Sequence, residues 1–178
     1  MKYLFWLIGF LILHTDQPNE ERIQWSEAYR LSWSDFKAEA NYEVGWAATT
    51  SSGMTHEYSG SITGDEVTYE SKVRCYFYPY NSWYKKELAT ENLLLHEQLH
   101  FDIAEIHARK LRKRIANKNF TKDLKKEMTA LYTLTNNEMK RMQHRYDEVT
   151  DYSLNKEKQK EWEGIIKREL ERLSAYKR

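Results

Sequence analysis

The segment of residues 90–116 constrains the fold most, because it combines a helical pattern of apolar residues with two histidines four positions apart. Residues 96–100 read His-Glu-Gln-Leu-His. On an α-helix, His96 and His100 lie about 40° apart around the axis and roughly 6 Å apart along it, so both imidazoles can reach one ion. Glu97 then occupies the place of the general base in the H-E-x-x-H pattern. The segment therefore predicts a helix that carries two metal ligands.

The residues that flank the motif support this helix. Thr90 can cap its start, and Glu91 suits the positive end of the helix dipole. Apolar residues recur at spacings of three to five and predict one buried stripe: Leu95, Leu99, Ile103, Ile106, Leu111 and Ile115. Each histidine of the motif follows a residue of this stripe, so we expect the pair at its edge, on the wall of a cleft. A half-buried pair bonded only to its neighbours is the alternative, and the motif favours metal.

The N-terminal residues differ from the rest of the chain. After Met1 and Lys2 comes an apolar run from Tyr3 to Leu13, which is too short to span a bilayer and is typical of a signal-peptide core. We expect residues 1–15 to be a signal peptide or an uncleaved anchor, and the protein to be exported to the periplasm or the extracellular space. The expected linker is residues 16–24, followed by a single domain over residues 25–178.

Charge and cysteine content exclude several classes of function. Lys2 is the only formal charge in residues 1–15, so without them 27 basic residues face 27 acidic ones. A neutral chain offers no general attraction to nucleic acid. The basic run at residues 109–114 is expected to be the solvated end of a long helix. Cys75 is the only cysteine, which excludes an internal disulfide and suggests a small core residue.

The order of elements along the chain predicts an α+β fold. Alternating residues predict strands, and a 3.6-residue period predicts helices. The expected strands are 42–50, 55–63 and 67–78, with turns at 51–53 and 64–65, and the expected helices are 90 to about 115, 121–148 and one from 156. Strands first and helices last favour an N-terminal antiparallel sheet packed on a long zincin-type metal helix, followed by two C-terminal helices.

The motif implies a reaction class. A catalytic zinc site takes three protein ligands and keeps one position for water. With two ligands from His96 and His100 and a base in Glu97, the expected reaction is hydrolysis of a peptide or related amide by metal-activated water. Tyr146 is a candidate donor to the oxyanion that forms.

The third ligand stays open at this level. His107 lies about 10 Å further along the helix than His100, and Glu105 points to the opposite side, so neither can share the ion on a regular helix. The remaining candidates cluster near the end of the second expected helix, and spacing alone does not choose among them: His144, Asp147, Glu148, Asp151 and Tyr152.

Three segments resemble the Bacteroidetes branch of domain of unknown function family 922, a family of predicted secreted zinc-dependent proteases. They are YRLSWSDFKA, LLLHEQLHFDIAEIHARKLRKRI and YDEVTDYSLNKEKQKEWEGII. The family's downstream pattern has Tyr-Asp, two residues, Thr, one residue and His, and this chain has Tyr152 in place of that His. The resemblance therefore favours Asp147 as the third ligand. The alternatives are a phenolate of Tyr152 or an impaired site.

Two hypotheses follow. The first is an exported zinc peptidase that aligns a peptide or protein substrate along a partly exposed sheet edge, without nucleic-acid partners and without a stable membrane span unless the N-terminal segment is retained. The second is a zincin-like binding or structural protein that has lost turnover. The sequence gives neither the substrate nor the oligomeric state.

Overall fold

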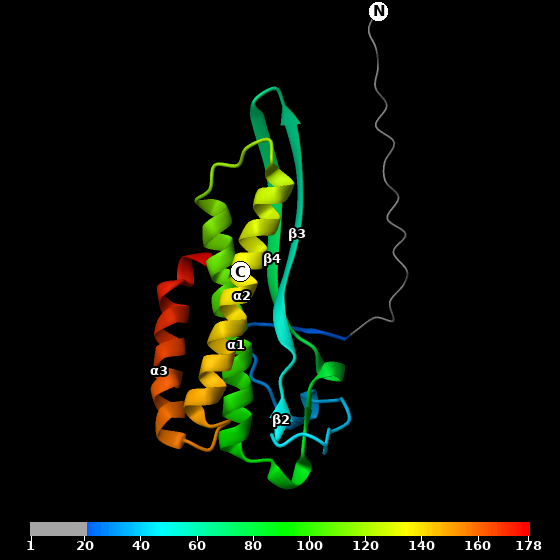
Figure 1. The fold of residues 1–178 in the computed structure, drawn as a ribbon, viewed down its shortest axis with the longest axis vertical. Helices are drawn as coiled ribbons and strands as arrows, with labels where there is room; N and C mark the ends of the chain where they lie inside the picture. Colours follow the sequence, from blue (N-terminus) through cyan, green and yellow to red (C-terminus); the bar gives the residue numbers. More distant parts are fainter. Residues whose placement is uncertain (1–20) are drawn as a thin grey trace, which may run out of the picture.

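A long β-hairpin packs along a bundle of three helices in the computed structural model, which describes residues 21–178 (Figure 1). The helices are α1 (Glu91–Ala116), α2 (Leu124–Thr150) and α3 (Lys156–Arg172). Helix α1 is central, because it contacts both hairpin strands, α2 and α3. The fold is α+β with an antiparallel sheet before the helices, as the sequence predicts.

The main sheet has three antiparallel strands in the order β1-β4-β3. They are β1 (Ile23–Gln24), β3 (Ser52–Thr63) and β4 (Glu66–Phe77). A second, two-stranded sheet pairs β2 (Ala48–Thr49) with β5 (Trp83–Tyr84). Single-turn 3₁₀ helices occupy Trp33–Asp35, Pro79–Asn81, Lys86–Leu88 and Ser174–Tyr176.

The hairpin forms where the sequence alternates most clearly. Val73, Cys75 and Phe77 are buried on the inward face of β4, as expected. Gly64 has φ of 62°, a left-handed conformation that glycine adopts at no steric cost, and it opens the two-residue turn to Glu66. The predicted turn at 51–53 is wrong, because β3 already starts at Ser52 and pairs with the end of β4.

The predicted strand 42–50 is wrong over most of its length. Only Ala48 and Thr49 pair, while Tyr42 and Trp46 are 65% and 45% exposed. The segment before them is held by side-chain bonds, among them Lys85 Nζ donating to the carbonyl of Val44. An alternating pattern makes a strand only where a neighbouring strand supplies backbone partners.

The expected linker 16–24 is also too long, because β1 (Ile23–Gln24) pairs with the end of β4. Its residues 16–20 lie outside the described residues, as does the expected signal segment 1–15. None of the described helices is both long and apolar enough to cross a membrane.

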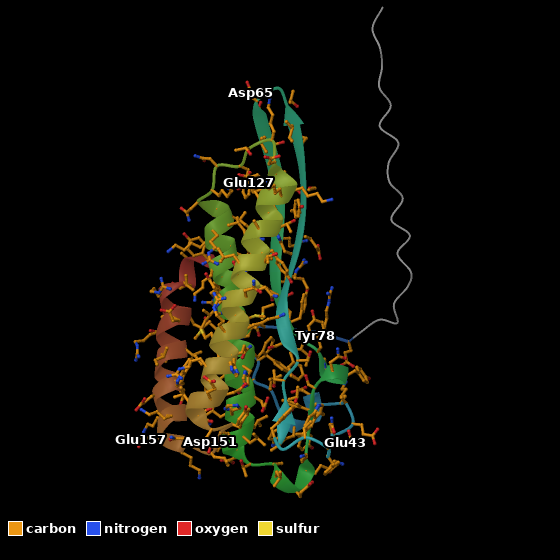
Figure 2. All side chains as sticks on the ribbon, viewed as in Figure 1. Glu43, Asp65, Tyr78, Glu127, Asp151 and Glu157 are labelled. Atoms are coloured by element: carbon orange, nitrogen blue, oxygen red, sulfur yellow. The ribbon has the colours of Figure 1, made fainter. Side chains whose placement is uncertain are left out.

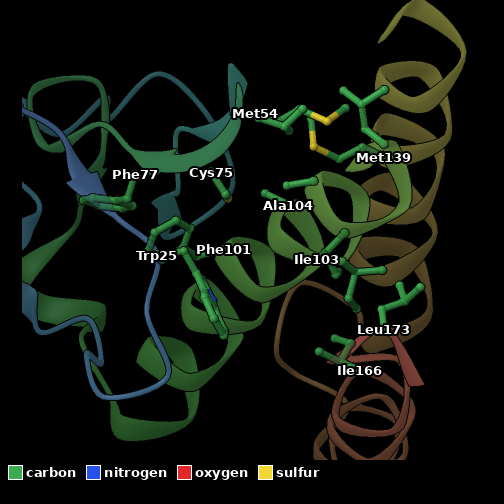
Figure 3. Close-up of a cluster of buried hydrophobic side chains, with 14 of the residues drawn as sticks. Trp25, Met54, Cys75, Phe77, Phe101, Ile103, Ala104, Met139, Ile166 and Leu173 are labelled. Atoms are coloured by element: carbon green, nitrogen blue, oxygen red, sulfur yellow. The ribbon is translucent and has the colours of Figure 1, made fainter. Parts of the chain in front are cut away.

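Helix α1 begins where the sequence predicts. The Thr90 hydroxyl accepts a hydrogen bond from the Leu93 amide at 3.1 Å. The stripe on α1 is buried as expected, except that Leu95 is 36% exposed. The core runs from Phe77 and Phe101 on the sheet side, past Ile103, to Ile166 on α3 (Figure 3). The first turns of α1 are thus fixed on several sides, which makes them a rigid support for the motif.

The basic run on α1 is solvated only in part, which corrects the sequence expectation: Lys113 is exposed, but two arginines of the run are buried. Arg109 and Arg112 are 1% and 8% exposed. Both donate to Glu105 Oε1 at 2.9 Å, and Arg109 also donates to the carbonyl of Leu170 on α3. The two cations are buried because α3 covers this part of α1, a packing that local sequence does not encode.

Candidate metal centre

The two motif histidines and Asp147 converge at one point. His96 and His100 lie on the second and third turns of α1, and Asp147 lies on the last turn of α2, which runs antiparallel beside it. Asp147 Oδ1 is 3.2 Å from His96 Nε2 and 2.8 Å from His100 Nε2, and the two Nε2 atoms are 3.2 Å apart. Among the described residues, these three form the group able to hold a metal ion.

The three distances fit a tetrahedral ion. Ligand atoms about 2.0–2.1 Å from a tetrahedral zinc ion lie about 3.3 Å from one another. The observed separations of 2.8, 3.2 and 3.2 Å are close to this spacing. Two imidazoles and one carboxylate are also the donor set of a catalytic zinc site with an open fourth position. The residues present therefore fit the ion without rearrangement.

Gln143 fixes which nitrogen of His100 can bind a metal. The Gln143 amide nitrogen donates to the His100 carbonyl at 3.0 Å, so its oxygen Oε1 must face His100 Nδ1. The imidazole therefore carries its proton on Nδ1 and donates it to Oε1. In neutral His100, Nε2 then presents a lone pair to the Asp147 carboxylate, and two acceptors at this distance repel unless a proton or a metal cation lies between them.

The charges of the site reflect this need for a cation. Burial alone would lower the pKa of His100, but the hydrogen bond to Asp147 and the negative charge of Glu97 outweigh it and raise that pKa. Burial would raise the pKa of Asp147, but the hydrogen bonds from His100 and His96 hold it well below its usual range. The cluster is thus anionic enough to retain a proton, and a metal would compete for the same place.

Glu97 lies in the cleft without a partner of its own. It is 3% exposed and lines the cleft together with both histidines and Asp147. Within residues 21–178, no hydrogen bond or ion pair reaches its carboxylate. A buried carboxylate that no protein group satisfies is free to accept a proton from water, which is the property that a general base requires.

Tyr146 lies behind the histidines and not on the cleft wall. Its ring stacks on His96 with the centroids 4.5 Å apart, and it meets the His100 ring edge to face. The side chain is fully buried, burial raises its pKa strongly, and its hydroxyl has no hydrogen-bond partner in the described part of the chain. The structure does not bring Tyr146 into the cleft as the predicted oxyanion donor; it supports the imidazole rings from behind.

The other predicted ligands lie outside the cluster. His144 is exposed and pairs with Glu148 at 3.3 Å, and Asp151 is an exposed left-handed residue after α2. Tyr152 is 50% exposed and lines the cleft, but it is not part of the three-atom cluster. His107 is buried, and its Nδ1 is bonded to the carbonyl of Ile103. It does not join the cluster, in agreement with the helix spacing that excluded it as a ligand.

The cleft has a cavity of about 530 Å³, bounded by α1 and α2 on one side and by the segment around β2 on the other. Trp46, Ala48, Thr50 and Ser52 contribute the second wall. Figure 2 places Glu43 and Asp151 at the same end of the molecule, opposite the hairpin tip at Asp65. The site therefore lies at one end of the helix bundle, where the segment around β2 forms its second wall.

Sequence reasoning missed Gln143 and the β2 wall. Gln143 precedes Asp147 by one helical turn, so it lies on the same face of α2. Once Asp147 is favoured as a ligand, this spacing predicts that Gln143 lies near the metal site. The β2 wall gave no usable signal, because the cleft brings together segments about 50 residues apart.

Comparison with known proteins gives a similarity to one family over part of the chain, and no activity. No curated protein and no solved structure matches the chain. Residues 81–153, which contain His96, Glu97, His100 and Asp147, match the sequence model of a family described as bacterial protein of unknown function (DUF922). The matched segment is less than half of the chain and holds the whole candidate metal centre, so the similarity to DUF922 is established for this segment.

Proposed function

We propose that this protein is an exported zinc-dependent peptidase. One observation carries the proposal: His96, His100 and Asp147 converge at tetrahedral spacing beside an unpaired carboxylate, Glu97, in an open cleft. A structural zinc site would be closed by a fourth protein ligand, whereas here the described residues supply three. The cleft provides room for a substrate beside the metal position.

Each residue has a role that its position supports. Bound zinc would activate water and polarise the substrate carbonyl. Glu97 accepts the proton of the attacking water and delivers it to the leaving amine. Gln143 holds the His100 ring in its ligating tautomer. Strand β3 is an edge strand of the main sheet, and it begins at Ser52 on the cleft wall. Its outer edge therefore offers backbone groups to an extended peptide.

Metal content tests the first part of this proposal. The full chain is purified, incubated with zinc, passed over a desalting column and analysed by elemental mass spectrometry beside His96→Ala. We expect about one zinc ion per chain, and close to none in the variant. His144→Ala serves as the control, because His144 borders the cleft without joining the cluster, and it should bind zinc as the parent does. Absence of stoichiometric zinc in the parent would refute the proposal.

Replacement of Glu97 by Gln tests the base. Gln keeps the size of the side chain and cannot take a proton, so hydrolysis of an unfolded protein such as casein should fall by roughly 10²- to 10⁴-fold while zinc content is unchanged. Glu148→Gln is the matched control, since Glu148 is an acid on the same helix as Asp147 but pairs outward with His144. Hydrolysis that persists in Glu97→Gln would remove the proposed mechanism.

A zinc-binding protein without turnover is the second candidate. The observation behind it is Tyr152, which borders the cleft where the resemblance places a His. Tyr152→His separates the two: a large gain in hydrolysis would mean that the natural chain is impaired. Because Asp147 already completes the three-atom cluster, we expect no such gain.

A further inference from the structure

A second cavity, of about 690 Å³, adjoins the metal cleft. It lies between the segment around Gly45, the start of α1 and the loop after α2. Four residues line both cavities and form a common wall: Trp46, Ala47, Leu93 and Tyr152. Because the two cavities share this wall, an extended substrate bound in the metal cleft can continue into the second cavity.

The lining of the second cavity is mainly apolar, and its larger apolar side chains are exposed. Trp46, Leu88 and Tyr152 are about half exposed, and Leu154 is 75% exposed. Single exposed apolar side chains are common on protein surfaces, but several around one cavity indicate a binding site. Lys156 is the only charged residue of the lining, and no carboxylate borders the cavity. The cavity is therefore suited to a large apolar side chain and unsuited to a cationic one.

The wall of the cavity is preformed by a constrained loop. Asp151, Tyr152 and Ser153 have φ of 48°, 50° and 79°, three consecutive non-glycine residues in the left-handed region. Such a conformation costs free energy and persists only where surrounding contacts enforce it. These contacts are present: the Tyr152 amide donates to the carbonyl of Asp147 at 3.0 Å, and the Asn92 side chain donates to the carbonyl of Ser153 at 2.7 Å.

The loop after α2 keeps two apolar side chains exposed. It turns the chain sharply after α2 and leaves Tyr152 and Leu154 at the cavity instead of in the core. The Asn92 contact is itself anchored, because Gln159 on α3 donates to both the side-chain and the backbone oxygen of Asn92. Strain held in place at the rim of a site, with apolar side chains exposed by it, is typical of a preorganised binding surface.

We propose that this cavity is the specificity subsite of the site described above, and that it takes a large apolar side chain, such as Leu or Phe, next to the attacked peptide bond. The inference rests on the proposed function for peptide hydrolysis, and on the cavity alone for the preference for a large apolar side chain. Trp46 and Tyr152 line both the metal cleft and the subsite, and Leu154 lines the subsite alone.

The test measures binding, so that no turnover is needed. Zinc-loaded Glu97→Gln protein is titrated calorimetrically with four acetylated and amidated hexapeptides of Ser and Gly, identical except for one central residue, which is Leu, Phe, Ala or Lys. We expect the Leu and Phe peptides to bind about 10- to 100-fold more tightly than the Ala and Lys peptides, as expected for burial of three or more carbon atoms.

Two variants alter the cavity from opposite directions. Gly45→Leu fills it, because a Cβ at Gly45 meets no atom within 4 Å. Leu154→Ala removes its outer wall at a position so exposed that folding is unaffected. Both should reduce the preference for Leu over Ala to less than about threefold. Leu134→Ala, at a half-exposed leucine on α2 that does not line the cavity, is the matched control and should retain the full preference.

The outcomes separate the two proposals. Equal affinity for the Leu and Ala peptides in a zinc-loaded protein would overturn the subsite and leave the metal centre intact. A preference that survives both Gly45→Leu and Leu154→Ala would also overturn it. A chain that binds no zinc but still prefers Leu, in a manner sensitive to Gly45→Leu, would support the subsite and refute the peptidase.

Discussion

Helix α1 carries two buried polar clusters, and they differ in how their hydrogen bonds are satisfied. In the middle of the helix, Glu105 accepts from both Arg109 and Arg112, and each guanidinium also reaches a backbone carbonyl. At the start of the helix, three metal-binding atoms face one another and Glu97 has no partner among the described residues. The first cluster joins helices; the second leaves converging acceptors, for which we propose a cation.

This difference distinguishes buried charged groups that stabilise the fold from buried charged groups that form a binding site. Buried polar groups are normally paired, because an unpaired one costs about 1–3 kcal/mol. In the Glu105 cluster the carboxylate is paired, and the one buried nitrogen without a hydrogen bond, Arg109 Nη2, lies 3.9 Å from the Glu27 carboxylate. Acceptors that converge without donors indicate that something else belongs there. The two clusters also make opposite predictions when their acids are removed.

The largest effect is expected for Glu105→Ala. The change leaves two buried guanidinium groups without their carboxylate, which should lower the free energy of unfolding by about 3–5 kcal/mol. In the other cluster, Glu97→Gln should change the free energy of unfolding much less, by about 1 kcal/mol or under, because it removes no hydrogen bond and only the electrostatic effect of Glu97 on His100. Urea unfolding of the metal-free proteins in a chelator measures both. Equal losses of unfolding free energy in Glu105→Ala and Glu97→Gln would contradict the difference between the two clusters.

The second effect concerns His107, which lies on α1 within the span of the Glu105–Arg112 cluster. Burial lowers its pKa from 6.5 to about 4, against the smaller opposing effect of the bond to Ile103. The unfolded chain takes up this proton below pH 6.5 and the folded chain only below about 4. Stability is therefore full above 6.5 and falls as the pH drops through this window, by roughly 3 kcal/mol in total.

His107→Leu is the variant that checks this assignment. Leucine has no proton to bind and is suited to the apolar surroundings. The part of the pH dependence between 6.5 and 4 that His107 contributes should disappear in urea titrations of the variant at several pH values. If parent and variant lose stability in parallel, the contribution comes from other groups.

A smaller effect is expected for Gln143→Leu. It removes the acceptor of His100 Nδ1, so zinc affinity should fall about 10- to 100-fold while saturating zinc still gives one ion per chain. Gln143→Glu keeps an acceptor and should recover most of the affinity. Competition with a chromogenic chelator measures all three proteins. Equal affinities in the parent and Gln143→Leu would show that the tautomer of His100 is set without Gln143.

The smallest effect is expected for Ser153→Gly. Glycine adopts φ of 79° without the steric cost that serine has, but it also has more conformational entropy to lose on folding. The net result should be a gain of about 0.5 kcal/mol in unfolding free energy. Ser153→Val, at the same position, should instead cost about 1–2 kcal/mol. Thermal unfolding compares the three, and a gain for Val would contradict the strained conformation.

Local features were predictable because they depend on residues close in sequence. The i, i+4 spacing places His96 and His100 on one face of α1, Thr90 caps that helix, and Gly64 turns the hairpin. The predicted strand 42–50 failed for the complementary reason: alternation specifies which faces a strand presents, and a strand also needs a partner.

The sequence by itself thus determined the three helices, the hairpin and two candidate metal ligands. The tertiary structure decided which of five candidates completes the cluster, because only the antiparallel packing of α2 on α1 places Asp147 at the histidines, 51 residues from His96. It also decided that Arg109 and Arg112 are buried and that Tyr146 supports the imidazoles from behind. Helical and strand periods act within one element, whereas the position of one element on another follows from the packing of the whole core.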